Sequence, residues 1–160
     1  MNRKNAIRII LPVVFIFIAV CYYNSLQINE DMELGNRIQS AVAQSLQQSE
    51  AEAVALKELT TFQWDTLYVI KPYNDVKVFC KEYNIGYKMI QYGYNEDSVL
   101  LVFVSDNKIV AYVDYKREDG DFSQQNIKEK YSAENAVFRF SRGEDAWISV
   151  EDQMGMNKAR

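Results

Sequence analysis

Four side chains that could bind a partner lie close together in the sequence: Trp64, Asp65, Tyr68 and Tyr73. Aromatic side chains are common anchors of protein interfaces, and a neighbouring carboxylate adds polarity. The same residues also fit a structural role, in which Trp64 and Tyr68 pack in the core and Asp65 bonds a backbone N–H group or the Tyr73 hydroxyl. This stretch is therefore the candidate partner-binding site, although the sequence favours the structural interpretation.

Carboxylates are the other candidates for chemistry, because the chain contains no histidine. The lack of histidine excludes Ser-His-Asp and Cys-His catalysis and histidine metal sites. A pair such as Asp65 and Asp121 could support acid–base hydrolysis, but nothing in their spacing makes them neighbours. The run Glu118-Asp119-Gly120-Asp121 offers oxygen ligands for calcium, yet it lacks the pattern of a calcium-binding loop. We predict no catalytic residue, no metal site and no cofactor.

The two cysteines, Cys21 and Cys80, do not have the spacing of metal ligands. Cys80 lies on the apolar face of a predicted helix, where a thiol behaves as a small hydrophobic residue. Three tyrosines in a Gly- and Tyr-rich stretch, Tyr87, Tyr92 and Tyr94, fit two interpretations. They could line a sheet edge that pairs with a partner strand, or they could pack beside that edge in the ordinary way.

Residues 9–23 form an uncharged apolar segment that follows three basic residues, an arrangement typical of an export signal. A membrane-spanning helix needs about 20 residues, so this segment is short for an anchor. Ile18-Ala19-Val20-Cys21 resembles a lipobox, in which Cys21 would be lipidated, but Val20 replaces the expected small residue. The segment fits an uncleaved anchor, a lipoprotein signal, a cleaved signal, or a buried helix of a cytosolic domain. A retained anchor would place the C-terminal body outside the cytoplasm.

The charge of the chain is unevenly distributed. The first 23 residues hold three of the 18 basic residues and none of the 22 acidic ones, which leaves the remainder with a net charge of −7. An acidic body repels the phosphate backbone, so we predict no nucleic-acid partner. Nor does the sequence contain the long basic cluster that is typical of binding to anionic lipid.

The elements that must position these residues are centred on residues 98–115, which predict an antiparallel hairpin around the turn 105–108. Its first strand is apolar on both faces and therefore needs cover on both sides. Residues 24–57 carry a narrow apolar stripe at helical spacing and predict a helix, or a helix after a short linker. That helix could be a stalk or pairing helix, or it could lie on the sheet, and the sequence favours the sheet.

Shorter elements are expected along the rest of the chain. Residues 64–70 predict a strand that ends before Pro72, and Asn74 is a candidate cap for a helix over residues 75–83. Residues 89–94 fit an edge strand, and residues 127–131 fit a helical turn. Residues 136–140 and 146–150 predict a second hairpin with one wet face.

The stretch Phe62-x-Trp64-Asp65-x-x-Tyr68-x-x-x-Pro72-Tyr73, followed by a helix and a hairpin, resembles a group of small exported bacterial proteins. The resemblance covers about residues 62–122, and many proteins of that group are lipoproteins. It implies export but no reaction. The order of elements is also similar to small α+β modules of outer-membrane assembly lipoproteins and to β-lactamase-inhibitor-like domains, a likeness of fold that does not determine function.

We therefore predict an α+β fold with an N-terminal membrane or signal helix, a long amphipathic helix, and an antiparallel sheet of about four to five strands with one short helix. The expected segments are a signal-anchor or lipoprotein signal (1–23), a helical stalk or packing helix (24–58), an α+β domain (59–150) and a flexible tail (151–160). The predicted function is a non-enzymatic binding module for a protein partner at the extracytoplasmic face of a bacterial membrane. The alternatives are an immunity or inhibitor lipoprotein against a toxin or hydrolase and, less favoured, a carboxylate-dependent hydrolase.

Overall fold

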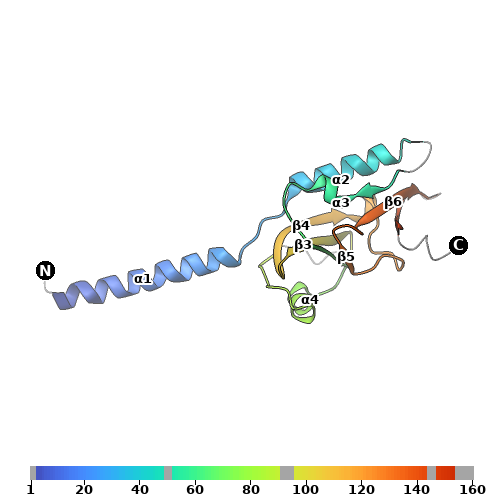
Figure 1. Ribbon diagram of the computed structural model, residues 1–160. Helices are drawn as coiled ribbons and strands as arrows, with labels where there is room; N and C mark the ends of the chain where they lie inside the picture. Colours follow the sequence, from blue (N-terminus) through green and yellow to red (C-terminus); the bar gives the residue numbers. More distant parts are fainter. Residues whose placement is uncertain (1–2, 49–51, 91–95, 144–146, 154–160) are drawn as a thin grey trace.

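The computed structural model describes residues 3–48, 52–90, 96–143 and 147–153, with side chains from residue 12 onward. An N-terminal helix, α1 (Arg3–Leu26), projects from an α+β body with two antiparallel sheets (Figure 1). The described part of the body also holds three further α-helices. The α+β class predicted from the sequence is therefore confirmed.

The larger sheet has the strand order β4-β3-β2-β5, and all its neighbours are antiparallel. Its strands are β2 (Thr66–Ile70), β3 (Ser98–Ser105), β4 (Lys108–Lys116) and β5 (Lys130–Ser132). Asp106 and Asn107 form the turn between β3 and β4 with φ angles of 49° and 58°. Two successive left-handed residues match the twist of a tight hairpin, and Asp and Asn tolerate that conformation. The predicted central hairpin is confirmed.

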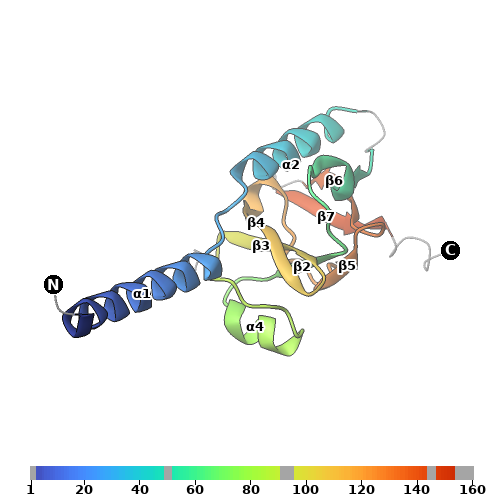
Figure 2. The ribbon, with the colours of Figure 1, turned by 60° about the vertical axis from the view of Figure 1, so that its left-hand side comes forward.

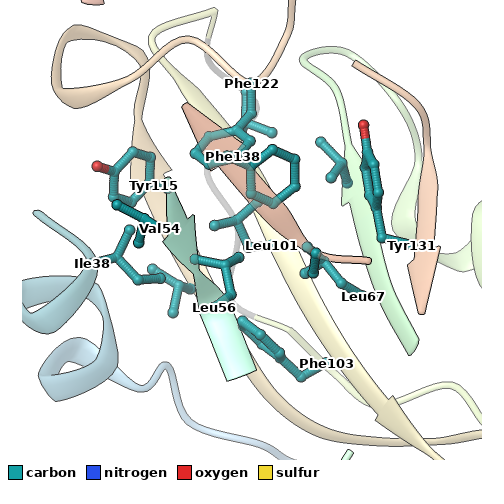
Figure 3. Packing of buried hydrophobic residues seen from close by; sticks show 14 of the residues in the cluster. Ile38, Val54, Leu56, Leu67, Leu101, Phe103, Tyr115, Phe122, Tyr131 and Phe138 are labelled. Atoms are coloured by element: carbon teal, nitrogen blue, oxygen red, sulfur yellow. The ribbon is translucent and has the colours of Figure 1, made fainter. Parts of the chain in front are cut away.

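Strand β3 is buried on both faces, as its sequence requires. Val99, Leu101 and Phe103 belong to one hydrophobic cluster, and the intervening residues Leu100 and Val102 belong to another. A helix covers each face, with α2 (Met32–Ser45) above and α4 (Val76–Glu82) below (Figure 2). The smaller sheet joins α2 on the first face, where the rings of Phe122 and Phe138 fill the core (Figure 3).

Helix α2 lies on the sheet, which decides between the two interpretations of residues 24–57. Leu34, Ile38 and Val42 are buried against the first face of the larger sheet. A Cβ atom built on Gly35 would lie 3.2 Å from Val113, so the glycine permits this close approach. The side chain of Asp31 caps the helix by accepting a hydrogen bond from the Leu34 N–H at 2.9 Å.

Of the two predictions for residues 24–57, a continuous helix and a helix after a short linker, the structure shows the second, with a helix that ends earlier than expected. Residues 27–31 separate α1 from α2, and α2 is followed by β1 (Val54–Ala55) and α3 (Leu56–Leu59). The backbone N–H of Asp31 donates to the Tyr112 carbonyl at 2.9 Å. The chain therefore leaves the helix to bond the edge of β4, and the cap of Asp31 then starts a new helix. The apolar stripe begins only at Leu34, after residues 27–31, so its spacing alone did not locate the break.

The smaller sheet has the order β1-β6-β7 and contains the second predicted hairpin. Its strands β6 (Val137–Arg142) and β7 (Ile148–Asp152) bury Phe138, Phe140 and Val150, while Arg139 is exposed. The expected alternation of buried and wet positions is thus confirmed. Strand β7 extends two residues into the predicted tail of residues 151–160, because Asp152 is buried and pairs with Phe138. Residues 154–160 lie outside the described residues.

Two local predictions on the other side of the molecule need correction. Asp75, not Asn74, caps α4, because its carboxylate accepts a hydrogen bond from the Val78 N–H at 2.9 Å. Residues 130–132 form β5 instead of part of a helical turn, because they pair with the second edge of β2. The predicted edge strand over residues 89–94 falls mainly outside the described residues.

The described part of α1 carries nine large apolar side chains between Val13 and Tyr23 that are 48–74% exposed. Even so, no helix among the described residues combines the length and apolar character needed to cross a membrane. The membrane helix predicted from residues 9–23 is therefore not shown, and membrane tethering stays a prediction.

Candidate functional site

The two aromatic anchors of the candidate site, Trp64 and Tyr68, are buried on opposite faces of the larger sheet. Trp64 is 7% exposed, lies edge-on to Phe103 with ring centroids 5.0 Å apart, and donates a hydrogen bond to the Thr60 hydroxyl at 3.0 Å. Tyr68 is 4% exposed and packs against Phe79 in the other cluster. These two side chains therefore hold the core and do not form one surface.

The other two members of the candidate site, Asp65 and Tyr73, make hydrogen bonds to different parts of the chain. The Asp65 carboxylate accepts a hydrogen bond from the Asp106 N–H at 2.9 Å and so braces the turn between β3 and β4. Tyr73 is 64% exposed, has a φ angle of 66°, and donates its hydroxyl to the Glu96 carboxylate at 2.7 Å. The expected bond between Asp65 and a backbone N–H group is present, whereas Tyr73 bonds Glu96 instead of Asp65.

Asp65 and Asp121 lie at opposite ends of the β3–β4 hairpin, so they are not a catalytic pair. Asp65 bonds the turn at one end, whereas Asp121 bonds Arg117, which follows the last residue of β4. The eight residues of β3 separate these ends, a length of roughly 20 Å or more at the usual rise of a strand. Acid–base hydrolysis requires carboxyl groups roughly 5–10 Å apart, so these two residues do not meet that requirement.

Arg117 and Asp121 form a two-pronged ion pair at the end of the sheet. The Arg117 Nε and Nη2 atoms donate to the two carboxylate oxygens of Asp121, each at 2.9 Å. The Ser123 hydroxyl and backbone N–H also donate to Asp121, at 2.6 and 2.9 Å. Burial alone would raise the pKa of Asp121, but the hydrogen bonds from Arg117 and Ser123 outweigh it and hold this pKa below its ordinary value.

The ion pair accounts for the acidic run that was a candidate calcium site. Asp121 is committed to Arg117, and Glu118 lies 3.4 Å from the Lys116 ammonium group. Within the described residues, no group of three or more acidic or cysteine side chains is placed to hold a metal ion. Arg117 also donates to the Glu96 carbonyl at 2.8 Å and lies over the Trp147 ring at 5.6 Å. These contacts join the segment before β3 in the larger sheet to the residue before β7 in the smaller sheet.

A hollow of about 560 Å³ lies at the same end of the sheet, lined in part by the residues on either side of Arg117. Its lining residues come from the segment before α2, the start of β3, the end of β4 and the residue before β7: Glu30, Asp97, Ser98, Asp114, Lys116, Glu118 and Trp147. The Glu30 carboxylate accepts a hydrogen bond from the Asp114 N–H at 3.2 Å. Four carboxylates beside one lysine and an indole ring suit an amino or guanidinium group better than an anion.

No motif in the sequence indicates this hollow. Glu30 and Asp114 are 84 residues apart, and only the folding of the interhelical segment onto β4 brings them together. One buried oxygen of Asp114, Oδ1, has no hydrogen-bond partner among the described residues. The acidic balance of the body was the single relevant signal in the sequence, and a net charge does not say where acids converge.

The remaining candidates are divided between the core and the surface. Cys80 is buried against the lower face of the larger sheet, and burial raises the pKa of its thiol. Cys21 is exposed on α1. Tyr87 is 40% exposed next to the end of α1. Tyr92 and Tyr94 lie outside the described residues, so their expected role at a sheet edge stays a prediction.

Comparison of the chain with protein-family models, curated proteins and solved structures finds no match. The likeness of residues 62–122 to small exported bacterial proteins therefore stays a resemblance of sequence. Any function must be argued from the residues and contacts of this chain.

Proposed function

We propose that this chain is a non-enzymatic binding module, held at the extracytoplasmic face of a bacterial membrane by its N-terminal segment. The apolar surface of α1 carries the proposal. A helix that is apolar all round is stable when lipid or protein surrounds it, and not when water does. The body already has a closed core that does not include residues 12–23, so these side chains need a partner outside the chain.

Removal of the apolar side chains of α1 from water would release a large free energy. Full burial of a valine, isoleucine or phenylalanine side chain contributes about 1.5–3 kcal/mol. The nine apolar side chains between Val13 and Tyr23 are about half exposed or more, so their removal from water is worth on the order of 10 kcal/mol. That amount is comparable to the whole stability of a small domain. An acyl-chain environment supplies this burial, and the basic residues before the segment favour retention of its start in the cytoplasm.

The proposal has two forms, which differ in how the chain is attached. In one, Met1 is retained and the apolar helix is itself the anchor. In the other, the chain is cut before Cys21, and lipid on that thiol replaces the helix. Cys21 is exposed on α1 and does not contribute to either core cluster, so its modification does not disturb the body.

Fractionation of bacterial cells that produce the full chain tests this proposal. We expect the chain in the membrane fraction, resistant to extraction by high salt and released by detergent. Protease added to spheroplasts should digest the body, because the body lies outside the cytoplasm. Mass spectrometry of the purified protein then separates a retained Met1 from a lipidated Cys21. Recovery of the intact chain from the cytosol, protected from protease, would refute the proposal.

The binding role is tested separately by crosslinking in the same cells. Trp64→Ala and Tyr68→Ala are unsuitable because both side chains hold the core. The acidic hollow offers exposed positions instead, so Glu118→Gln is compared with Arg139→Ala, an exposed substitution on the smaller sheet. A crosslinked protein lost in the first variant and kept in the second would support partner binding at this end. If neither variant changes the crosslinking pattern, the hollow is not the binding surface.

A further inference from the structure

We infer that the body does not swing freely on its anchor, but rests one edge against the headgroups of the bilayer. That edge is the surface formed by Tyr87, Lys88, Lys108 and Val110, here called the anchor-side patch. The inference rests on the proposed function, because it requires α1 to be tethered in a membrane. It adds an orientation and a second lipid contact to that proposal.

The end of α1 is bonded directly to the body, with no free linker between them. The Met89 N–H donates to the Leu26 carbonyl at 2.7 Å, and Gln27 and Met89 form a parallel β-bridge. The Lys88 ammonium group donates to the Ser25 carbonyl. In both ribbon views the segment that follows α4 passes beside the end of α1 (Figures 1 and 2).

The residues after α1 continue this attachment. Ile28 packs against the hydrophobic cluster on the lower face of the larger sheet. The Asp31 N–H then bonds the Tyr112 carbonyl at the edge of β4. Gln27 and Asp31 are thus held by backbone bonds, Ile28 by packing and Glu30 through its side chain, so four of the five residues between α1 and α2 are attached. A change of angle between α1 and the body would break these contacts, so the helix and the body move together.

The anchor-side patch lies at the level where α1 ends. Gly86 forms a parallel bridge with Lys108 and donates its N–H to the Asn107 carbonyl at 2.7 Å, which sets Tyr87 alongside the start of β4. Tyr87 and Val110 are each 40% exposed, and the Lys108 side chain is exposed.

The composition of the patch suits a lipid interface. Tyrosine is enriched where membrane meets water, and lysine binds anionic headgroups. Lys88 and Lys108 give the patch two basic groups within a body whose net charge is −7, and the acids at the adjoining turn are Asp106 and Asp65. Tyr22 and Tyr23, at the end of α1, are 66% and 51% exposed and would occupy the same interface. The patch and the tyrosines therefore place aromatic and basic groups at one depth.

The test is a measurement of depth on the full chain. A fluorescent amino acid is inserted at position 23, 87 or 139, one at a time, which leaves both cysteines in place. Each protein is reconstituted in vesicles of phosphatidylethanolamine and phosphatidylglycerol that contain a headgroup-quenching lipid. Position 23 reports the tether, position 87 the patch, and position 139 the exposed face of the smaller sheet. Val110 serves as a second patch position if the label at Tyr87 prevents folding, which circular dichroism would reveal.

We expect strong quenching at positions 23 and 87 and little at position 139. Lys108→Gln should lower the ratio of docked to undocked protein about fivefold, because each lysine near an anionic surface contributes that much to binding. Lys130→Gln, at the opposite edge of the same sheet, is the matched control and should leave quenching unchanged. High salt should weaken quenching at position 87 but not at position 23.

The outcomes separate the two proposals. Quenching at position 23, with positions 87 and 110 no more quenched than position 139, would overturn the docked edge and leave the tether intact. Absence of quenching at position 23 would overturn the proposed tether and the docked edge with it. Equal effects of Lys108→Gln and Lys130→Gln would exclude the anchor-side patch as the site of lipid contact.

Discussion

Replacement of Ile38 by alanine tests whether α2 is a structural part of the body or a separate stalk. Ile38 is fully buried between α2 and the larger sheet. The substitution removes three carbon atoms, which costs about 2 kcal/mol of transfer free energy. The cavity left behind adds up to about 2 kcal/mol if its walls do not relax. We therefore expect the free energy of unfolding to fall by about 2–4 kcal/mol.

The assay is urea unfolding of the full chain in a mild nonionic detergent. The fluorescence of Trp64, which belongs to the same cluster as Ile38, reports the loss of the core. A loss of about 3 kcal/mol should lower the urea midpoint by about 1–2 M at an unchanged slope. Gln39→Ala is the matched control, because Gln39 is exposed on the same helix and should change stability by about 0.5 kcal/mol or less.

A stalk would behave differently. If Ile38→Ala and Gln39→Ala unfold at the same urea concentration as the parent, α2 does not share the core and its placement on the sheet is wrong. If Ile38→Ala prevents folding, Ile38→Val gives a smaller perturbation. It should cost about 0.5–1.5 kcal/mol and keeps the comparison measurable.

Three further predictions concern the ion pair, the turn and the cysteines. The pKa of Asp121 is lowered in the folded state. The ionised carboxylate therefore contributes to the free energy of unfolding above the unfolded pKa of about 3.9, and this contribution is lost as the pH falls through the folded-state pKa. In urea melts, the difference in stability between the parent and Asp121→Asn should be larger at pH 7 than at pH 3. Asn107 has a φ angle of 58°, so Asn107→Val should destabilise the hairpin by about 1–2 kcal/mol and Asn107→Gly should not; equal midpoints would contradict the left-handed turn. Cys80 is buried with a raised pKa, whereas Cys21 is exposed, so a thiol reagent added to the unlipidated chain at pH 8 should modify Cys21 quickly and Cys80 only on unfolding.

The central hairpin was predictable because its information is local. β-Branched and aromatic residues on both faces of residues 98–105 required a strand with cover on each side. Asp106 and Asn107 supplied a turn that tolerates left-handed backbone. Strand β5, at the far edge of the same sheet, was harder to predict, because it lies in a polar stretch and owes its extended form to the free edge of β2. A strand of three residues is too short to show a periodic pattern that would indicate pairing with a distant strand.

The dispersal of the candidate site has a simple geometric cause. Trp64 and Tyr68 are four residues apart, which in a continuous strand places both side chains on one face. Strand β2 begins only at Thr66, however, and Trp64 precedes it in irregular backbone. The alternation is therefore interrupted between the two aromatics, and they enter different cores. A spacing of four residues would place both aromatic side chains on one face of a strand, but β2 starts after Trp64 and includes only Tyr68.

The sequence by itself determined the α+β class, the strand with two buried faces, the apolar faces of α2 and α4, and the acidic body that follows an apolar N-terminal segment. These follow from composition and from periods of two and 3.6 residues, which depend on neighbouring residues alone. Only the tertiary structure decided that the interhelical segment bonds β4, that Glu30 meets Asp114, and that α1 is bonded to Met89. Those contacts join residues far apart in the chain, because backbone groups at a sheet edge require partners and any segment of suitable reach can supply them.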